Sequence, residues 1–266
     1  MIPHTSNRIR ALRFHRRMGG QAMTEYMIVF PVMLVLIFGT LQFALLYQAK
    51  VQLNYAAFES ARSGSLNNAQ RWALNAGAVR GLVPLHTHGS GRNWLRWARS
   101  KVWDQIEQGL VEVEIINPTE EAFENHGMDD GEDRLIPNDN LMYRAATLKG
   151  TGTSKISIQD ANLLKIRLLY CVDMHVPFVN RMINSLLRLR APTADPNSSG
   201  PSGTVATGQL SAWTDNGIGF AARSGSFERE CLDREPQQHI PIMSEATIRM
   251  HTPPIFDPLP EEVAAP

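Results

Sequence analysis

An uncharged stretch of 24 residues, from Tyr26 to Ala49, limits what this chain can fold into. Most of its side chains are large and apolar. As a helix rising about 1.5 Å per residue it is roughly 36 Å long, enough to cross a hydrocarbon core of about 30 Å. The sequence therefore predicts a single-pass membrane protein, with the transmembrane segment assigned to Tyr26 to Tyr47.

The basic N-terminus predicts the orientation of this segment. Residues 1–20 contain five arginines and no carboxylate. By the positive-inside rule, the N-terminus is expected in the cytoplasm and the chain after Lys50 outside the bacterial inner membrane, in the periplasm. The remainder of the chain carries more acidic than basic side chains, because the whole chain is neutral. Nucleic acid is therefore not expected as a partner, since phosphate binding needs a concentrated basic surface.

A cleaved secretory signal peptide is the main alternative for the apolar stretch, because it also has a basic start and an apolar core. Three features argue against it. The stretch is longer than a usual signal-peptide core, no small-x-small cleavage site follows it, and Val51, Tyr55 and Phe58 keep helical spacing beyond it. The sequence predicts one continuous transmembrane and stalk helix over residues 21–64.

A single carboxylate, Glu25, stands at the N-terminal edge of the apolar stretch. Moving a charged group into the bilayer core costs free energy, so a carboxylate at this position calls for a structural or functional explanation. If the chain were cut after Gly20, Gln21 would become the first residue, Glu25 the fifth and Tyr26 the sixth.

The segment from Gly20 to Tyr26 resembles the leader-peptidase site of Flp and Tad prepilins, and residues 19–64 are similar to the TadE-like family. A basic leader, a GQ…E junction, an apolar run and an N-A-A…A-R tail recur in that family. The matching residues after the junction are Pro31, Gly39, Phe43, Asn54, Ala56, Ala57, Ala61 and Arg62.

The resemblance implies a minor pseudopilin or membrane-anchored assembly component of a Tad/Flp type IVb pilus. Residues 1–20 would be a basic leader peptide, removed after Gly20 by a prepilin peptidase. Other pilins, pseudopilins and the pilus assembly machinery would be its partners. Glu25 would then neutralise the new α-amino group of its own chain or of a neighbour. The alternative is an interfacial carboxylate that favours a helix N-terminus. Incorporation into the filament and a TadF rather than a TadE role stay open.

Residues 65–252, called the head below, are predicted to be an α+β, pilin-like periplasmic domain with a small antiparallel sheet on the stalk helix. Strands are expected at 110–116, 162–174 and 240–250, and helices at 67–81, 92–108 and 178–190. The segment 117–160 is expected to be a loop, 191–208 a flexible linker, and 253–266 a Pro-rich disordered tail. In the second helix, Trp94, Trp97 and Trp103 are expected in the core, the alternatives being a sugar platform or a membrane-surface contact.

The two cysteines, Cys171 and Cys231, are 60 positions apart and have no metal-site spacing. In an oxidising compartment a disulfide between them is favoured over two unpaired thiols.

Catalytic and metal-binding patterns are weak. The acidic segment 128–134 lacks the alternating ligands of a calcium loop, and His86 and His88 are interpreted as an exposed loop pair. No serine or histidine lies in the local context of a known nucleophile. We therefore predict no enzyme, no cofactor and no metal. The competing hypothesis is a signal-anchored periplasmic binding protein or enzyme.

Overall fold

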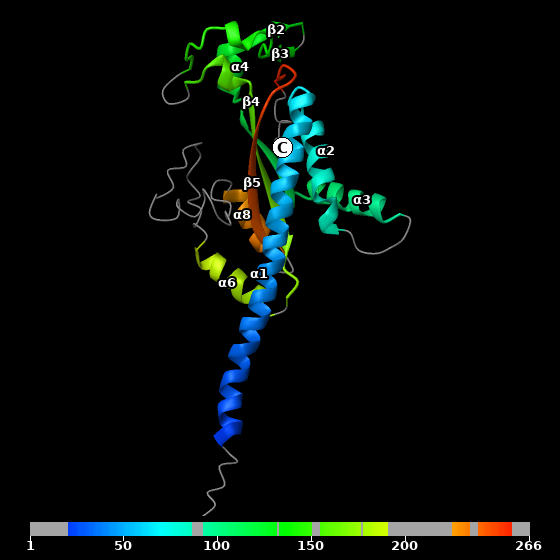
Figure 1. Ribbon diagram of the computed structural model, residues 1–266, viewed down its shortest axis with the longest axis vertical. Helices are drawn as coiled ribbons and strands as arrows, with labels where there is room; N and C mark the ends of the chain where they lie inside the picture. The colour runs from blue at the N-terminus through cyan, green and yellow to red at the C-terminus, as the bar shows by residue number, and fades with distance from the viewer. Residues whose placement is uncertain are drawn as a thin grey trace, which may run out of the picture.

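The computed structural model describes residues 21–86, 93–131, 133–150, 155–176, 178–190, 225–234 and 239–256. It is dominated by the helix α1, Gln21–Leu66, which is 46 residues long. Figure 1 shows α1 running the length of the molecule, with its N-terminal half projecting alone and its C-terminal half packed on the head. The predicted leader, residues 1–20, and the predicted linker, 191–208, lie outside the described residues.

A helical hairpin forms the start of the head. The helix α2, Arg71–Leu82, folds back on α1 after a turn in which Asn68 and Ala69 have positive φ. Small residues make this contact: a Cβ on Gly77 would lie 2.6 Å from the Ser60 Cα. The Ser60 hydroxyl donates to the Leu74 carbonyl at 2.8 Å. The two helices are therefore in backbone contact, which large side chains would prevent.

A three-stranded antiparallel sheet packs against this hairpin. It consists of β1 (Val111–Asn117), β4 (Leu163–Asp173) and β5 (His239–Arg249), in the order β1-β4-β5. Alternate β4 residues, including Leu164, Ile166 and Leu168, join buried α1 and α2 side chains in the main core. The alternation of apolar side chains on β4 thus puts one face of the sheet on the stalk, as the sequence predicts.

The opposite face of the sheet is covered by a different helix. Leu169 and Cys171 of β4 pack against Phe227 and Cys231 of α8, Gly225–Asp233. Arg167 on the same face is 8% exposed, and its guanidinium bridges Glu114 at 2.9 Å and Glu245 at 2.6 Å. The sheet is thus the middle layer between the α1–α2 hairpin and α8.

Two further helices flank the sheet. After the 3-10 turn η1, Val83–His86, α3 (Trp94–Glu107) packs through Ala98 and Val102. The helix α6, Val179–Arg190, lies beside α1 at the end of the head nearest the projecting half of α1 (Figure 1).

The expected loop at 117–160 is wrong, because much of this segment is folded. It contains α4 (Glu120–His126), the hairpin β2 (Met128–Asp130) and β3 (Asp133–Leu135), η2 (Leu141–Tyr143) and α5 (Ile158–Ala161). These elements form a distal lobe with its own small core of Ala122, Phe123, Ile136, Leu141, Ile158 and Ala161. Short elements with few apolar residues gave no clear periodicity, which is why the sequence did not show them.

The beginning of the expected tail is also ordered. The backbone N–H groups of Ile255 and Phe256 donate to the carbonyls of Asn68 and Arg134. The Phe256 ring meets Phe123 at 5.3 Å between centroids. Residues 253–256 therefore join the α1–α2 turn to the distal lobe, whereas 257–266 lie outside the described residues.

The predicted fold class is confirmed: the molecule is α+β, with a long apolar N-terminal helix, small antiparallel sheets and helices. The three strands and three head helices expected from the sequence match β1, β4, β5, α2, α3 and α6 to within a few residues at each end.

Candidate functional site

The projecting half of α1 is the first candidate functional feature. No side chain from Met23 to Leu41 is buried, although most are large and apolar. Those 19 residues are roughly 28 Å long as a helix, close to the thickness of a hydrocarbon core. Among the residues that the structure describes, α1 is the one helix long and apolar enough to cross a membrane. We call Met23–Leu41 the exposed anchor.

Contact between α1 and the head begins within the span expected to be transmembrane. Gln42 is 1% exposed, and its Oε1 accepts a hydrogen bond at 3.0 Å from the Val176 N–H. Leu46 is buried one turn later. From Gln42 onward, the expected segment from Tyr26 to Tyr47 therefore includes residues that pack against the head. A glutamine in an apolar run was the sequence signal for this boundary.

The predicted processing site lies at the free end of the exposed anchor. Gly20 lies outside the described residues, while Gln21, Glu25 and Tyr26 lie in the first two turns of α1. Glu25 is exposed, and the Tyr26 ring stacks on Phe30 at 5.1 Å between centroids. Since Gln21 and Glu25 are four residues apart, they share one face of the helix.

Small residues in the part of α1 that follows the apolar segment attach the stalk to the head. Ala56, Ala57 and Ala61 are all completely buried. The Asn54 Oδ1 accepts a hydrogen bond from the Ser244 hydroxyl of β5 at 2.8 Å. The residues that carry the N-A-A…A pattern are thus contacts between the stalk and the head.

The opposite side of the stalk carries an apolar stripe that continues beyond the exposed anchor. Its members follow one another at intervals of three or four residues and are about half exposed: Phe43, Tyr47, Val51, Tyr55 and Phe58. Such spacing puts them on one helix face. A contiguous exposed apolar surface of this kind marks a membrane or protein contact.

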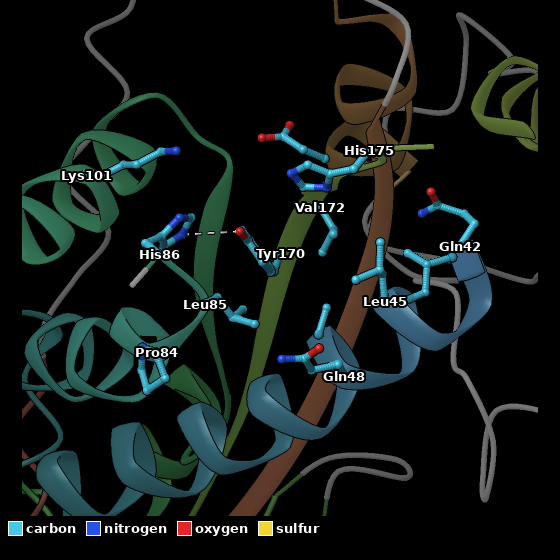
Figure 2. Close-up of a pocket in the computed structure, with 13 residues that line it drawn as sticks. Gln42, Leu45, Gln48, Pro84, Leu85, His86, Lys101, Tyr170, Val172 and His175 are labelled. Carbon is cyan, nitrogen blue, oxygen red and sulfur yellow. Dashed lines mark hydrogen bonds between the residues drawn. The ribbon is translucent and has the colours of Figure 1, made fainter. Parts of the chain in front are cut away.

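A cavity of about 480 Å³ lies between α1, η1, α3 and β4. Figure 2 shows Gln42, Leu45 and Gln48 of α1 on one side of it and His86 and Lys101 on the other, with Tyr170 directed toward His86. The Tyr170 hydroxyl lies 3.4 Å from the His86 Nε2. Burial raises the pKa of Tyr170 well above its usual range, so the phenol is neutral and can bind only as a hydrogen-bonding group.

The structure corrects the interpretation of His86. It is 6% exposed and lines the cavity, so it is not part of an exposed loop pair; His88 lies outside the described residues. Tertiary packing buries it, since η1 contacts α1, α2 and α3 and the His86 ring meets Tyr170 of β4, and nothing in the local sequence signals these contacts.

The expectation that the α3 tryptophans lie in the core is also wrong. Trp94, Trp97 and Trp103 are 38–48% exposed, while Ala98 and Val102 make the buried face. Helical spacing identified an amphipathic helix, but the smaller residues face the core. Lys101 Nζ lies 5.5 Å from the Trp97 ring centroid, on this half-exposed surface.

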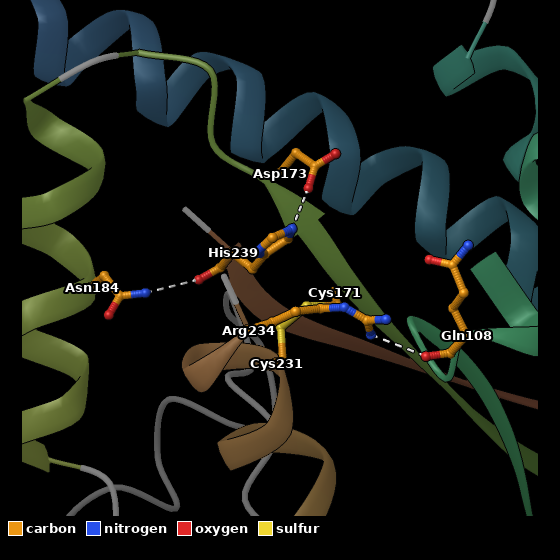
Figure 3. The surroundings of a disulfide bond; sticks show 7 residues. All are labelled: Gln108, Cys171, Asp173, Asn184, Cys231, Arg234 and His239. Atoms are coloured by element: carbon orange, nitrogen blue, oxygen red, sulfur yellow. Dashed lines mark hydrogen bonds and ion pairs between the residues drawn. A yellow bond between two sulfur atoms is a disulfide. The ribbon is translucent and has the colours of Figure 1, made fainter. Parts of the chain in front are cut away.

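Cys171 and Cys231 form a disulfide that joins β4 to α8 (Figure 3). Nearby, the His239 Nε2 lies 2.7 Å from Asp173, and the Asn184 side chain of α6 donates to the His239 carbonyl. The hydrogen bond from His239 lowers the pKa of Asp173. These contacts tie α6 and α8 to the end of the sheet nearest the exposed anchor.

Groups of three or more His, Cys, Asp or Glu that could hold a metal ion do not occur in the described part of the chain. The described residues of the acidic segment lie in the β2–β3 hairpin, 128–130 in β2 and 133–134 in β3, and Gly131 after β2 has φ +77°. The described geometry therefore assigns this segment a structural place in the distal lobe.

Together these features define an α+β protein with one candidate membrane helix near its N-terminus. Residues 20–62 match the model of the family described as TadE-like protein, which confirms the resemblance over those residues. The match supports involvement in Tad pilus assembly. Comparison with curated proteins and with solved structures gave no match.

Proposed function

We propose that the chain is a minor pseudopilin or membrane-anchored assembly component of a Tad/Flp pilus, cut by a prepilin peptidase after Gly20. The overlap between the family match and two structural features of α1 supports this proposal most strongly. The residues that match the TadE-like family, 20–62, are nearly the same residues that form the exposed anchor and the small-residue contact with the head. The match also includes Gly20 and Glu25, the two residues on which the processing proposal depends.

The proposed orientation places the head in the periplasm. The five arginines in residues 1–20 favour a cytoplasmic N-terminus. The disulfide between Cys171 and Cys231 fits an oxidising compartment. The inner membrane and the periplasm are therefore the proposed location.

Glu25 has a proposed role in assembly. After cleavage, the new α-amino group would be on Gln21, one helical turn from Glu25 and on the same face. In an apolar helix bundle an isolated charge is costly, so this carboxylate would pair with the amino group of its own chain or of a neighbour. The apolar stripe from Phe43 to Phe58 would extend the contact with neighbouring helices along the stalk.

The mature N-terminus tests the proposal directly. Mass spectrometry of the membrane-extracted protein is expected to show a chain that starts at Gln21. This species should disappear in a host without prepilin peptidase and in a Gly20→Ala variant, whereas Gly19→Ala should still be cut. An intact Met1 start in all strains, or a cut beyond Ala49, would contradict the proposal.

We further propose that the head is not an enzyme and acts through protein contacts. The alternative, a signal-anchored periplasmic binding protein or enzyme, has one observation in its favour: the cavity lined by His86, Lys101 and Tyr170. That alternative would be favoured if the protein kept its leader and if deleting the protein left pilus function unchanged.

A further inference from the structure

The helix α6 has an exposed apolar face that nothing in the described structure covers. Phe178, Met182 and Leu186 are 68%, 43% and 59% exposed. Met182 and Leu186 are four residues apart in α6 and therefore lie on one side of the helix, whereas Phe178 is the residue directly before α6 and has a positive φ of 72°. Met182 and Leu186 therefore form an exposed apolar face of α6, and the exposed Phe178 precedes the helix at its N-terminal end.

The other face of α6 is fixed to the head. Asn180 and Asn184, on the side of the helix opposite Met182, are at most 4% exposed, and the Asn184 side chain donates to the His239 carbonyl at the start of β5. Figure 3 shows α6 beside this end of the sheet. With one face bound to the sheet, the apolar face must point away from it.

The position of α6 along α1 narrows the choice of partner. The segment before α6 is tied to α1 by the hydrogen bond from Val176 to Gln42. Gln42 is the residue directly after the exposed anchor, Met23–Leu41. Figure 1 shows α6 at this level, beside α1 and below the sheet. A bilayer that covers the exposed anchor would have its surface at α6.

The charge of α6 fits a bilayer surface. Its sequence includes Arg181, Arg188 and Arg190 and no carboxylate. Helices that lie in the membrane interface combine an apolar face with basic residues, which are attracted to anionic headgroups.

We propose that α6 lies in the outer interface of the membrane, with Phe178, Met182 and Leu186 inserted among anionic phospholipids. The occupant of this face is thus a lipid surface. The inference rests on the proposed membrane anchoring of α1. With α1 and α6 both bound to lipid, the head has two attachments and therefore one preferred tilt relative to the bilayer. A subunit that leaves the membrane would have to detach α6 as well as α1.

Three methionine positions provide a matched test in the full-length chain. Met182→Cys samples the α6 face, Met33→Cys the exposed anchor, and Met142→Cys the distal lobe, where Met142 is 87% exposed. Each variant is labelled with a nitroxide at the new cysteine, since Cys171 and Cys231 are joined. The protein is placed in nanodiscs of phosphatidylcholine and phosphatidylglycerol, and collisions with oxygen and with a water-soluble nickel chelate are measured by electron paramagnetic resonance. Circular dichroism confirms that each variant is folded.

We expect oxygen collisions to exceed nickel collisions at positions 33 and 182, and the reverse at 142. If nickel collisions exceed oxygen collisions at 182 while oxygen collisions exceed nickel collisions at 33, the proposal for α6 is overturned and the anchoring of α1 still holds. Protection of 182 from both reagents would also overturn it, because the face would then be covered by protein. If nickel collisions exceed oxygen collisions at 33, the proposed anchoring of α1 is wrong, and the proposal for α6 is then wrong as well. Leu186→Cys must agree with Met182→Cys.

Discussion

Gly81 of α2 lies so close to Ala56 of α1 that a Cβ on Gly81 would stand 2.3 Å from the Ala56 Cα. The Gln52 side chain donates to the Gly81 carbonyl at 2.6 Å in the same contact. The stalk and the first head helix therefore meet backbone to backbone. This contact explains why a stalk that carries large apolar residues on its outer side carries alanines on its inner side.

Replacing Gly81 with alanine is expected to destabilise the head by about 2 kcal/mol, because the added methyl group has no space and the two backbones must separate. Urea unfolding in detergent, followed by circular dichroism, measures the free energy of unfolding. Gly39→Ala is the control, since a Cβ there meets nothing within 4 Å. Equal stability of the two variants would show that the close contact is absent in solution.

Removing the disulfide by replacing both Cys171 and Cys231 with serine is expected to lower stability. The bridge closes a loop between residues 60 apart, which in the chain-entropy model is worth about 4 kcal/mol. The melting temperature of the double variant should match that of the reduced wild-type protein. A wild-type melting temperature that does not change on reduction would contradict this prediction.

Arg167→Met is expected to destabilise the protein by about 2 kcal/mol, because Glu114 and Glu245 lose their shared partner. Arg167 is nearly buried while both carboxylates are partly exposed. The loss of stability on removing its guanidinium should therefore lie between the values for buried and for surface ion pairs. The control is Arg80→Met, since Arg80 is 46% exposed in its pair with Glu59 and should contribute less than about 1 kcal/mol. Similar losses in both variants would contradict the assigned role of Arg167.

The same ion pairs predict a pH dependence. Partial burial alone would raise the pKa of Glu245, but hydrogen bonds from Lys165 and Arg167 outweigh it, and its pKa lies below its usual range. A carboxyl group with a lowered folded-state pKa stabilises the fold above its unfolded pKa of about 4.3 and loses this effect as the pH falls through the folded value. The stability difference between wild type and Arg167→Met should therefore narrow below about pH 4. A constant difference from pH 7 to pH 3 would argue against this linkage.

Tyr55→Glu is expected to leave the head folded and to impair pilus assembly, if the apolar stripe contacts neighbouring helices as proposed. Tyr55 is 54% exposed, so its replacement should change the free energy of unfolding by less than about 0.5 kcal/mol. Complementation of a deletion strain, with pili counted by electron microscopy, measures the effect. Met142→Glu serves as the control on a distant exposed surface. Normal pili with Tyr55→Glu would exclude the stripe as an assembly contact.

Much of the fold was predictable because its periodicities are strong. The alternation of Leu164, Ile166 and Leu168 predicted β4, and the spacing of Met182 and Leu186 predicted α6. The distal lobe was missed because its helices and strands are short, and its core draws on Phe123, Ile136 and Ile158, which are far apart in the sequence. The α3 tryptophans were placed in the core because spacing shows that a helix has two faces, without showing which face meets the sheet.

The sequence by itself determined the candidate membrane helix, the family resemblance and the sheet strands, since these depend on local composition and on repeats of two or three to four residues. Tertiary structure decided where the contact between α1 and the head begins, at Gln42, and which residues surround His86. It also decided that α6 lies beside the end of the exposed anchor. These relationships join residues more than 80 positions apart, and only the packing of α1, the sheet and α6 against one another brings such residues together.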